Sequence, residues 1–137
     1  MVRKILLIII VLVIGIGVAG AKPIRQTGDK FTQFLTEFKA AVAKDDKEKL
    51  YTMVSPDKFL WEGLNKGFID SKDKFMKNYP SMFTKAIKEK ITSGKLVKFQ
   101  GGNYSIEWTE KEVDYSLDFI PEKDGSYKFY GLSVTPP

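Results

Sequence analysis

The side chains that could do chemistry in this sequence are carboxylates, lysines, tyrosines and serines, because the 137 residues include no histidine and no cysteine. Without thiols the chain cannot form a disulfide, a zinc–thiolate site, an iron–sulfur cluster or a cysteine nucleophile. Without imidazole it cannot be a serine–histidine hydrolase. We therefore expect no metal and no cofactor, and the sequence names no catalytic residue.

Seven aromatic residues are the candidates for a ligand-binding pocket. Large rings between helices and the apolar face of a sheet can line a cavity for a small apolar ligand, and any buried tyrosine hydroxyl would need a hydrogen-bond partner. The same rings can simply fill the core, and their spacing does not separate the two interpretations. The candidates are Trp61, Tyr79, Phe83, Tyr104, Trp108, Tyr115 and Phe129.

Catalysis in such a pocket would need a carboxylate beside a tyrosine. Glu62 and Asp70 are the acids that could approach Tyr79, Tyr104 or Tyr115. A general acid or base must lie within hydrogen-bond reach of its proton, with a suitably shifted pKa. A His-free isomerase or hydrolase using a pocket carboxylate and a tyrosine is therefore the alternative to a non-enzymatic binding domain.

Charge is unevenly distributed along the chain. Lysine and arginine total 22 against 17 acids, a formal net charge of +5. Only Arg3 and Arg25 are arginines, which argues against nucleic-acid binding. Lysines gather between residues 72 and 98 and acids between 106 and 124, and such opposite patches could pair between two copies in a homodimer.

The lysine-rich stretch predicts a basic surface on helices. Beyond an export signal, such a surface could meet an anionic membrane, a cell-wall polymer or an acidic partner protein. Exposed lysines that only keep a helix soluble would give the same pattern. The residues of this basic surface are Lys72, Lys74, Lys77, Lys85 and Lys88.

The first 21 residues have the pattern of an export segment. Arg3 and Lys4 precede an apolar run over residues 5–21, which ends in Ala19-Gly20-Ala21. A basic start, an apolar middle and small residues at the end are typical of a cleaved signal peptide, and the run is also long enough for an uncleaved membrane anchor. We expect an exported domain, periplasmic or extracellular, over residues 29–137, with a tether over 22–28.

Apolar periodicity predicts helices in the first half of the domain. Asp29, Asp46 and Ser71 are placed to cap three of them, and Ser93-Gly94 is placed to end the last. Pro80 is expected to open a separate helical segment at a kink. Residues 57–70 have no clear period and are expected to form a loop or a short strand.

From Leu96 onward the apolar period changes to two, which predicts strands. The expected turn at Glu110-Lys111 would pair Trp108 with Val113, Ile106 with Tyr115 and Tyr104 with Leu117. It would also place Glu107 opposite Asp114 on the polar face. A final strand starts near Tyr127, with a bulge at Gly131. Helices followed by an antiparallel meander indicate an α+β domain with helices packed on one face of a sheet.

This order resembles the cystatin-like α+β roll of the nuclear transport factor 2-like superfamily, and the chain is similar to small exported bacterial proteins of unassigned function. The motifs that carry the resemblance are Phe31-x-x-Phe34-x-x-x-Phe38, Asp45-Asp46, Ser71-x-x-x-Phe75-x-x-x-Tyr79, Met82-Phe83-Thr84 and Asp124-Gly125-Ser126-Tyr127. The resemblance implies enzymes as well as binding modules, so a fold of this kind does not define a function. Our leading hypothesis is an exported, non-enzymatic domain that holds a small apolar ligand between helices and sheet or docks a partner protein.

Overall fold

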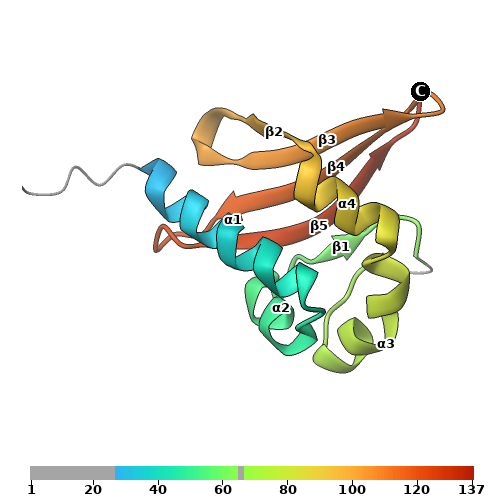
Figure 1. Cartoon of the computed structure of the whole chain (residues 1–137), viewed down its shortest axis with the longest axis horizontal. Coiled ribbons are helices and arrows are strands. Elements are labelled where there is room, and N and C mark those ends of the chain that lie inside the picture. The colour runs from blue at the N-terminus through green and yellow to red at the C-terminus, as the bar shows by residue number, and fades with distance from the viewer. Residues whose placement is uncertain (1–26, 65–66) are drawn as a thin grey trace, which may run out of the picture.

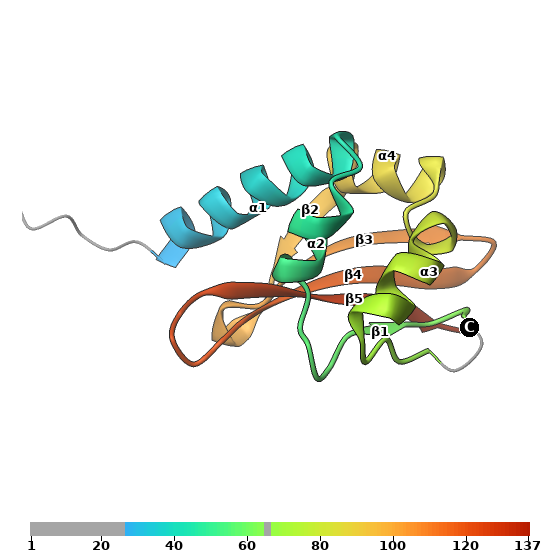
Figure 2. The same cartoon turned by 90° about the horizontal axis from the view of Figure 1, so that it is seen from below.

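The computed structural model describes residues 27–64 and 67–137, and there four helices pack on one face of a five-stranded sheet (Figures 1 and 2). The predicted export segment lies outside the described residues. Within the two described stretches, none of the helices is long and apolar enough to cross a membrane. The α+β class, with helices before the meander, is as predicted. The helices are α1 (Thr27–Ala43), α2 (Lys47–Met53), α3 (Lys72–Met82) and α4 (Lys85–Ser93), and the strands are β1 (Leu60–Trp61), β2 (Lys95–Lys98), β3 (Tyr104–Glu110), β4 (Val113–Pro121) and β5 (Tyr127–Thr135), with a short 3₁₀ turn at Gln100–Gly102.

Two of the predicted helix caps are present. The Asp46 side chain accepts a hydrogen bond from the Lys49 backbone N–H at 3.0 Å, and Ser71 accepts one from the Lys74 N–H at 3.3 Å. α1 already begins at Thr27, two residues before the predicted cap at Asp29. Helix ends commonly shift by that much, because the first turn has no complete set of backbone hydrogen bonds.

The break predicted at Pro80 is in the wrong place. α3 continues through Pro80 to Met82, and Thr84 caps the next helix by accepting from the Ile87 N–H at 3.3 Å. Proline removes one backbone hydrogen bond from a helix. That loss is tolerated here because Pro80 lies in the last turn, where the buried Met82 still packs against the core.

The sheet has the order β1-β5-β4-β3-β2, with β2 to β5 antiparallel and β1 parallel to β5. The bulge predicted near Gly131 is confirmed, because Asp118 pairs with Gly131 while Phe119 pairs with Phe129, which leaves Tyr130 unpaired. Gly131 has φ +112°, and a Cβ built on it would lie 1.8 Å from the Leu60 carbonyl oxygen. A glycine is therefore what lets β1 add to the sheet.

The predicted register of the β3–β4 hairpin is wrong by two residues on β4. Trp108 pairs with Tyr115, Ile106 with Leu117 and Tyr104 with Phe119. The turn is at Lys111 and Glu112, which have φ of 51° and 65°. Two-residue hairpin turns with positive φ at both positions match the twist of the strands, so this turn forms without the glycine or asparagine that would have marked it in the sequence.

Glu107 consequently pairs with Ser116, not with Asp114. Asp114 instead lies opposite Thr109 and accepts a hydrogen bond from its hydroxyl at 2.6 Å. The like-charge contact expected on the polar face is absent, because the two-residue shift separates the acids.

The role of Gly131 can be tested against a second glycine of positive φ. Gly101 has φ +79° with no atom within 4 Å of a built Cβ. We expect Gly101→Ala to lower the free energy of unfolding by about 1 kcal/mol, from backbone strain alone. Gly131→Ala should cost more than about 3 kcal/mol, because β1 must also move away. Urea denaturation of both variants measures the difference, and equal losses would show that the contact with Leu60 is unimportant.

Candidate functional site

Four of the seven predicted pocket residues meet in one cluster between helices and sheet. Tyr79 stacks on Phe83 with ring centroids 4.8 Å apart, Trp61 lies 5.6 Å from Phe83, and Phe129 lies 6.3 Å from it. All four side chains are buried. Aromatic rings at such separations are in direct contact, which favours a packed core at this place over a ligand cavity.

The other three predicted residues lie elsewhere. Tyr104 stacks on Phe31 of α1 at 3.6 Å. Trp108 and Tyr115 stack on each other at 5.2 Å where β3 and β4 approach their turn, and the Lys90 ammonium lies 5.5 Å from the Trp108 ring. The structure thus distributes the candidates over three parts of one continuous core and does not bring them together around one pocket.

The carboxylate that meets a predicted tyrosine is Asp45. Its Oδ1 accepts a hydrogen bond from the Tyr79 hydroxyl at 2.8 Å and one from the Lys88 ammonium at 2.6 Å. In the sequence Asp45 is noted only in the Asp45-Asp46 motif of the family resemblance, so its contacts with Tyr79 and Lys88 are not foreseen. The acids that were considered lie elsewhere: Glu62 accepts a hydrogen bond from the Val134 backbone N–H, and Asp70 pairs with Lys74 at 2.6 Å.

The end of α1 positions Asp45. The Asp46 N–H donates to the Ala41 carbonyl at 2.9 Å and the Asp45 N–H donates to the Val42 carbonyl at 3.2 Å. This is the Schellman arrangement, in which the residue after the helix takes a left-handed conformation. Asp45 has φ +52°, in a position where glycine is usual and aspartate is tolerated. The fold therefore holds a carboxylate at the corner between α1 and α2.

The electrostatics of this group do not suit acid–base catalysis near neutral pH. The hydrogen bonds from Lys88 and then Tyr79 lower the pKa of Asp45, so it stays ionised. Burial, followed by the hydrogen bond to Asp45, raises the pKa of Tyr79, so its hydroxyl stays protonated. A catalytic acid or base needs a pKa moved toward the working pH. The Asp45–Tyr79–Lys88 group instead links the α1–α2 corner to α3 and α4.

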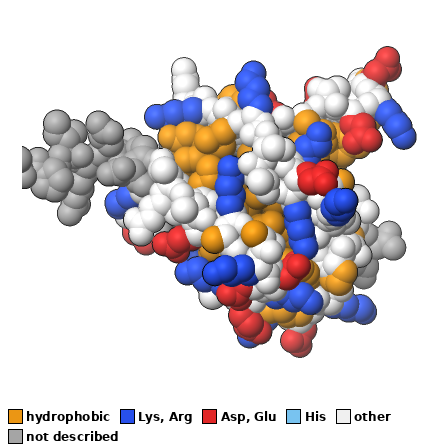
Figure 3. Space-filling model, in the orientation of Figure 1, with side chains coloured by type: hydrophobic (Ala, Val, Ile, Leu, Met, Phe, Trp, Pro, Cys, Tyr) orange, Lys and Arg blue, Asp and Glu red, His pale blue; other side chains and the backbone are white. Residues whose placement is uncertain are grey.

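The predicted basic surface is partly neutralised. Lys72 pairs with Glu48, and Lys88 with Asp45, each at 2.6 Å. Lysine and acidic side chains are accordingly interspersed on the helix-bearing face (Figure 3). Lys77 and Lys85 are exposed and make no ion pair among the described residues.

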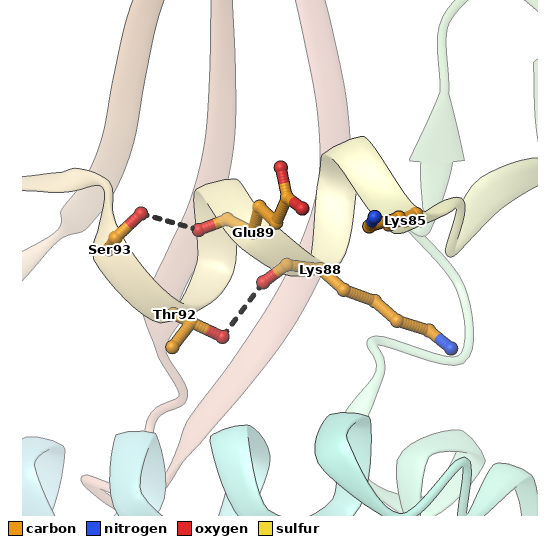
Figure 4. A pocket seen from close by; sticks show the side chains of 5 residues that line it. All are labelled: Lys85, Lys88, Glu89, Thr92 and Ser93. Carbon is orange, nitrogen blue, oxygen red and sulfur yellow. Dashed lines mark hydrogen bonds between the residues drawn. The ribbon is translucent and has the colours of Figure 1, made fainter.

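A hollow of about 360 Å³ runs along the outer side of α4 (Figure 4). Its hydroxyls are already used by the helix, because Thr92 donates to the Lys88 carbonyl at 2.9 Å and Ser93 to the Glu89 carbonyl at 2.8 Å. Lys88 is directed to Asp45. The hollow therefore offers few free polar groups to a ligand. The lining residues are Lys85, Lys88, Glu89, Thr92 and Ser93.

The face of the sheet opposite the helices carries no described helix (Figure 2). Hydroxyls and carboxylates alternate across its centre. The Asp118 carboxylate accepts hydrogen bonds from Ser116 at 2.5 Å and Ser133 at 3.0 Å, and Ser105 donates to Glu107 at 3.1 Å. This face is therefore polar at its centre, where Ser105 is buried, and it also carries Lys95 opposite Glu107 and Ile120 opposite Lys128. Across the described ranges, no group of three or more acidic residues is placed to hold a metal ion.

The comparisons with known proteins include two similar solved structures. No protein-family model and no curated protein matches the chain. An NTF-2 like protein of unknown function from Shewanella oneidensis is 13% identical, with a TM-score of 0.43 over 80% of this chain and 98% of that one. A Xanthomonas campestris protein, provisionally described as a calcium/calmodulin dependent protein kinase II association domain, is 15% identical, with a TM-score of 0.43 over 86% and 93%. Each likeness concerns the fold alone.

The Tyr79 contact predicts a specific pH dependence of stability. In the unfolded chain Tyr79 ionises near its ordinary pKa of about 10, whereas in the folded chain its raised pKa keeps it protonated. Stability from this group is therefore present below about pH 10 and is lost as the pH rises further. Tyr79→Phe should cost about 1 kcal/mol at neutral pH, and the gap from the wild type should narrow above about pH 10.

Urea denaturation at a series of pH values measures this gap. Asp45→Asn serves as a control, because burial still raises the pKa of Tyr79 and asparagine tolerates the left-handed backbone. The free energy of unfolding of Asp45→Asn should therefore still decline in part above about pH 10. A gap between wild type and Tyr79→Phe that stays constant up to about pH 12 would contradict the assignment.

Proposed function

We propose that the chain is an exported, non-enzymatic interaction domain that binds a partner protein through the uncovered face of its sheet. The observation that carries this proposal is the arrangement of the helices, which all pack on the other face (Figure 2). A sheet face of some four strands, polar at its centre and without a described helix over it, offers a surface on which a second protein can lie. Export rests on the basic start and apolar run of residues 1–21.

The chemistry of the uncovered face defines the kind of partner. Glu107, Asp114 and Asp118 lie on it, and their sites alternate with serine and threonine hydroxyls. Two identical copies of such a face would bring carboxylates together, which is unfavourable. A partner with basic and hydrogen-bond-donating side chains fits better.

An enzyme of this fold has weaker support. Among the described residues, the pKa values that shift clearly all move away from neutrality. Those of Asp45, Asp70 and Asp124 are lowered, and those of Tyr79, Tyr127, Tyr130 and Lys72 are raised. Each group is therefore held more firmly in its ordinary protonation state. Shifts of the opposite sense are the ones that accompany catalytic acids and bases.

A small apolar ligand between helices and sheet is the second candidate for the bound molecule. The contacts among Trp61, Tyr79, Phe83 and Phe129 leave those rings packed against one another. A ligand at this place would have to separate them, at a cost in ring–ring contact. The partner protein is therefore the favoured binding mode, and the ligand is an outcome to test.

Native mass spectrometry of the protein recovered from its own cells tests the proposal. We expect a complex with a second protein that disappears in Ser116→Arg, because the long cation would stand on the sheet face. Lys85→Glu, on the outer side of α4, is the control and should leave the complex intact. A complex unaffected by Ser116→Arg would overturn the sheet-face assignment, and a reproducible small-molecule adduct without a partner would favour the ligand. The same mass shows whether the chain starts at Lys22 or keeps its first 21 residues.

A further inference from the structure

The two edges of the sheet differ in how well they are covered. β1 and β2 are the outermost strands. The outer side of β1 is paired with the segment that follows it, because the Trp61 N–H donates to the Gly67 carbonyl at 2.7 Å and the Ile69 N–H to the Phe59 carbonyl at 3.0 Å. β2 has β3 on its inner side, and along the described ranges no strand pairs with its outer side (Figure 1). β2 is therefore an open edge to which a further strand can add.

The hydrogen-bond pattern shows which backbone groups of β2 face outward. The Phe99 N–H donates to the Asn103 carbonyl at 2.8 Å, one residue beyond the end of the β2–β3 register. Hydrogen-bonded and non-hydrogen-bonded pairs alternate along an antiparallel ladder. Val97 is therefore bonded to β3, whereas the N–H and C=O groups of Leu96 and Lys98 point away from it. Each of these residues offers one donor and one acceptor at the edge.

Apolar side chains are exposed along the same strand. Leu96 is 41% exposed and Phe99, which follows β2, is 46% exposed. Leu96 pairs with the buried Ile106, so its side chain lies on the helix-bearing side of the sheet, whereas the half-buried Val97 lies on the other side. Single exposed apolar side chains are common in proteins, but here they accompany free backbone groups. A second strand beside β2 would cover the side chains and the backbone groups together.

The lysines of β2 already have favourable neighbours on β3. Lysine on an edge strand commonly discourages pairing with another chain. Lys95 is paired with Glu107, and the Lys98 ammonium lies 5.7 Å from the Tyr104 ring. A carboxylate on an added strand would therefore compete with neighbours that are already present, so charge gives an acidic partner little advantage. The features left for recognition are the free backbone groups and the apolar side chains.

We propose that β2 pairs antiparallel with β2 of a second copy of this chain, which gives a dimer with one continuous sheet. The register that fits places Val97 opposite Val97 on the two-fold axis. Leu96 then lies opposite Lys98, and the outward N–H and C=O groups of both residues bond across the interface. Lys95 lies opposite Phe99. No lysine is directly opposite a lysine, and each lysine stem lies along an apolar side chain.

Other registers fit less well. The outward hydrogen bonds are kept when one copy moves by two residues. A shift in one direction places Lys98 opposite Lys98, which is unfavourable because like charges then face each other. A shift in the other direction places Leu96 opposite Leu96 and leaves Phe99 beyond the paired residues. The proposed register is thus the one that covers both exposed apolar side chains and keeps the lysines apart.

The pairing leaves the uncovered face of the sheet accessible. An antiparallel edge-to-edge dimer has its two-fold axis perpendicular to the sheet, so the helices of both copies lie on one side. The uncovered faces then adjoin on the other side. The dimer does not depend on the function proposed above, and a failure of either leaves the other standing. Because a single short strand forms the interface, we expect the dimer to dissociate on dilution.

Disulfide formation tests the register. The chain has no cysteine, so Val97→Cys places one thiol of each copy at the two-fold axis. Directly opposite, non-hydrogen-bonded residues have Cα atoms about 4.5 Å apart, a distance that a disulfide spans. We expect mild oxidation of the full chain to link Val97→Cys into a covalent dimer. Lys95→Cys is the matched control, because it lies on the same strand and the same face but opposite Phe99, and it should stay monomeric. Equal cross-linking of both variants, or no cross-linking of Val97→Cys, would overturn the proposal.

Charge at position 96 tests the contact by a second route. Leu96→Lys places an ammonium group opposite Lys98 at both symmetric positions, so dimerisation should weaken about tenfold in sedimentation velocity. Leu96→Glu places a carboxylate there and should strengthen dimerisation instead. Phe68→Lys is the control at the other edge of the sheet, because Phe68 is also exposed, at 62%, and lies beside β1; it should leave dimerisation unchanged. Urea denaturation shows that each variant is folded. Equal effects of the two Leu96 substitutions, or a wild type that is monomeric at every concentration, would contradict the pairing.

Discussion

The packing of Phe129 is the contact on which both layers of the domain depend. This fully buried ring lies 4.9 Å from Phe38 of α1, 5.3 Å from Phe119 of β4 and 5.6 Å from Phe59, which precedes β1. It also meets Trp61 and Phe83, each at 6.3 Å. One side chain thus contacts the first helix, both neighbours of its own strand and the segment that follows α3. Such rings dominate core energetics because each buries a large apolar area in many contacts.

The need to cover this ring cluster explains which surfaces remain open. The described helices all lie on the aromatic side of the sheet, so the centre of the other side is left to serines, threonines and acids that hydrogen-bond to one another. The Asp45–Tyr79–Lys88 group lies on the covered side, where its hydrogen bonds connect the end of α1 to α3 and α4. The Asp45–Tyr79–Lys88 group and the aromatic core thus lie on one side of the sheet, and the other side carries no described helix.

The features that the sequence predicted correctly were those that depend on residues close together in the chain. Asp46 and Ser71 were identifiable as caps because a cap depends on residues within one turn. The hairpin register was not identifiable, because a shift of two residues leaves every side chain on the same face. What selects the register is the stacking of Trp108 on Tyr115, together with a turn at Lys111 and Glu112 that lacks the usual glycine or asparagine. The helix break predicted at Pro80 was wrong for a related reason, because the packing of the buried Met82 keeps α3 helical beyond the proline.

The sequence by itself determined the absence of thiol and imidazole chemistry, the order of helices before strands, and the face that each strand buries. These follow from residue type and from periods of two and 3.6, which need no knowledge of distant residues. Only the tertiary structure decided that Asp45 meets Tyr79, 34 residues away, and that β1 joins β5 at Gly131. Such meetings depend on how the helices and strands pack around the aromatic core, and packing is set by shape complementarity among residues that the chain brings together only when it folds.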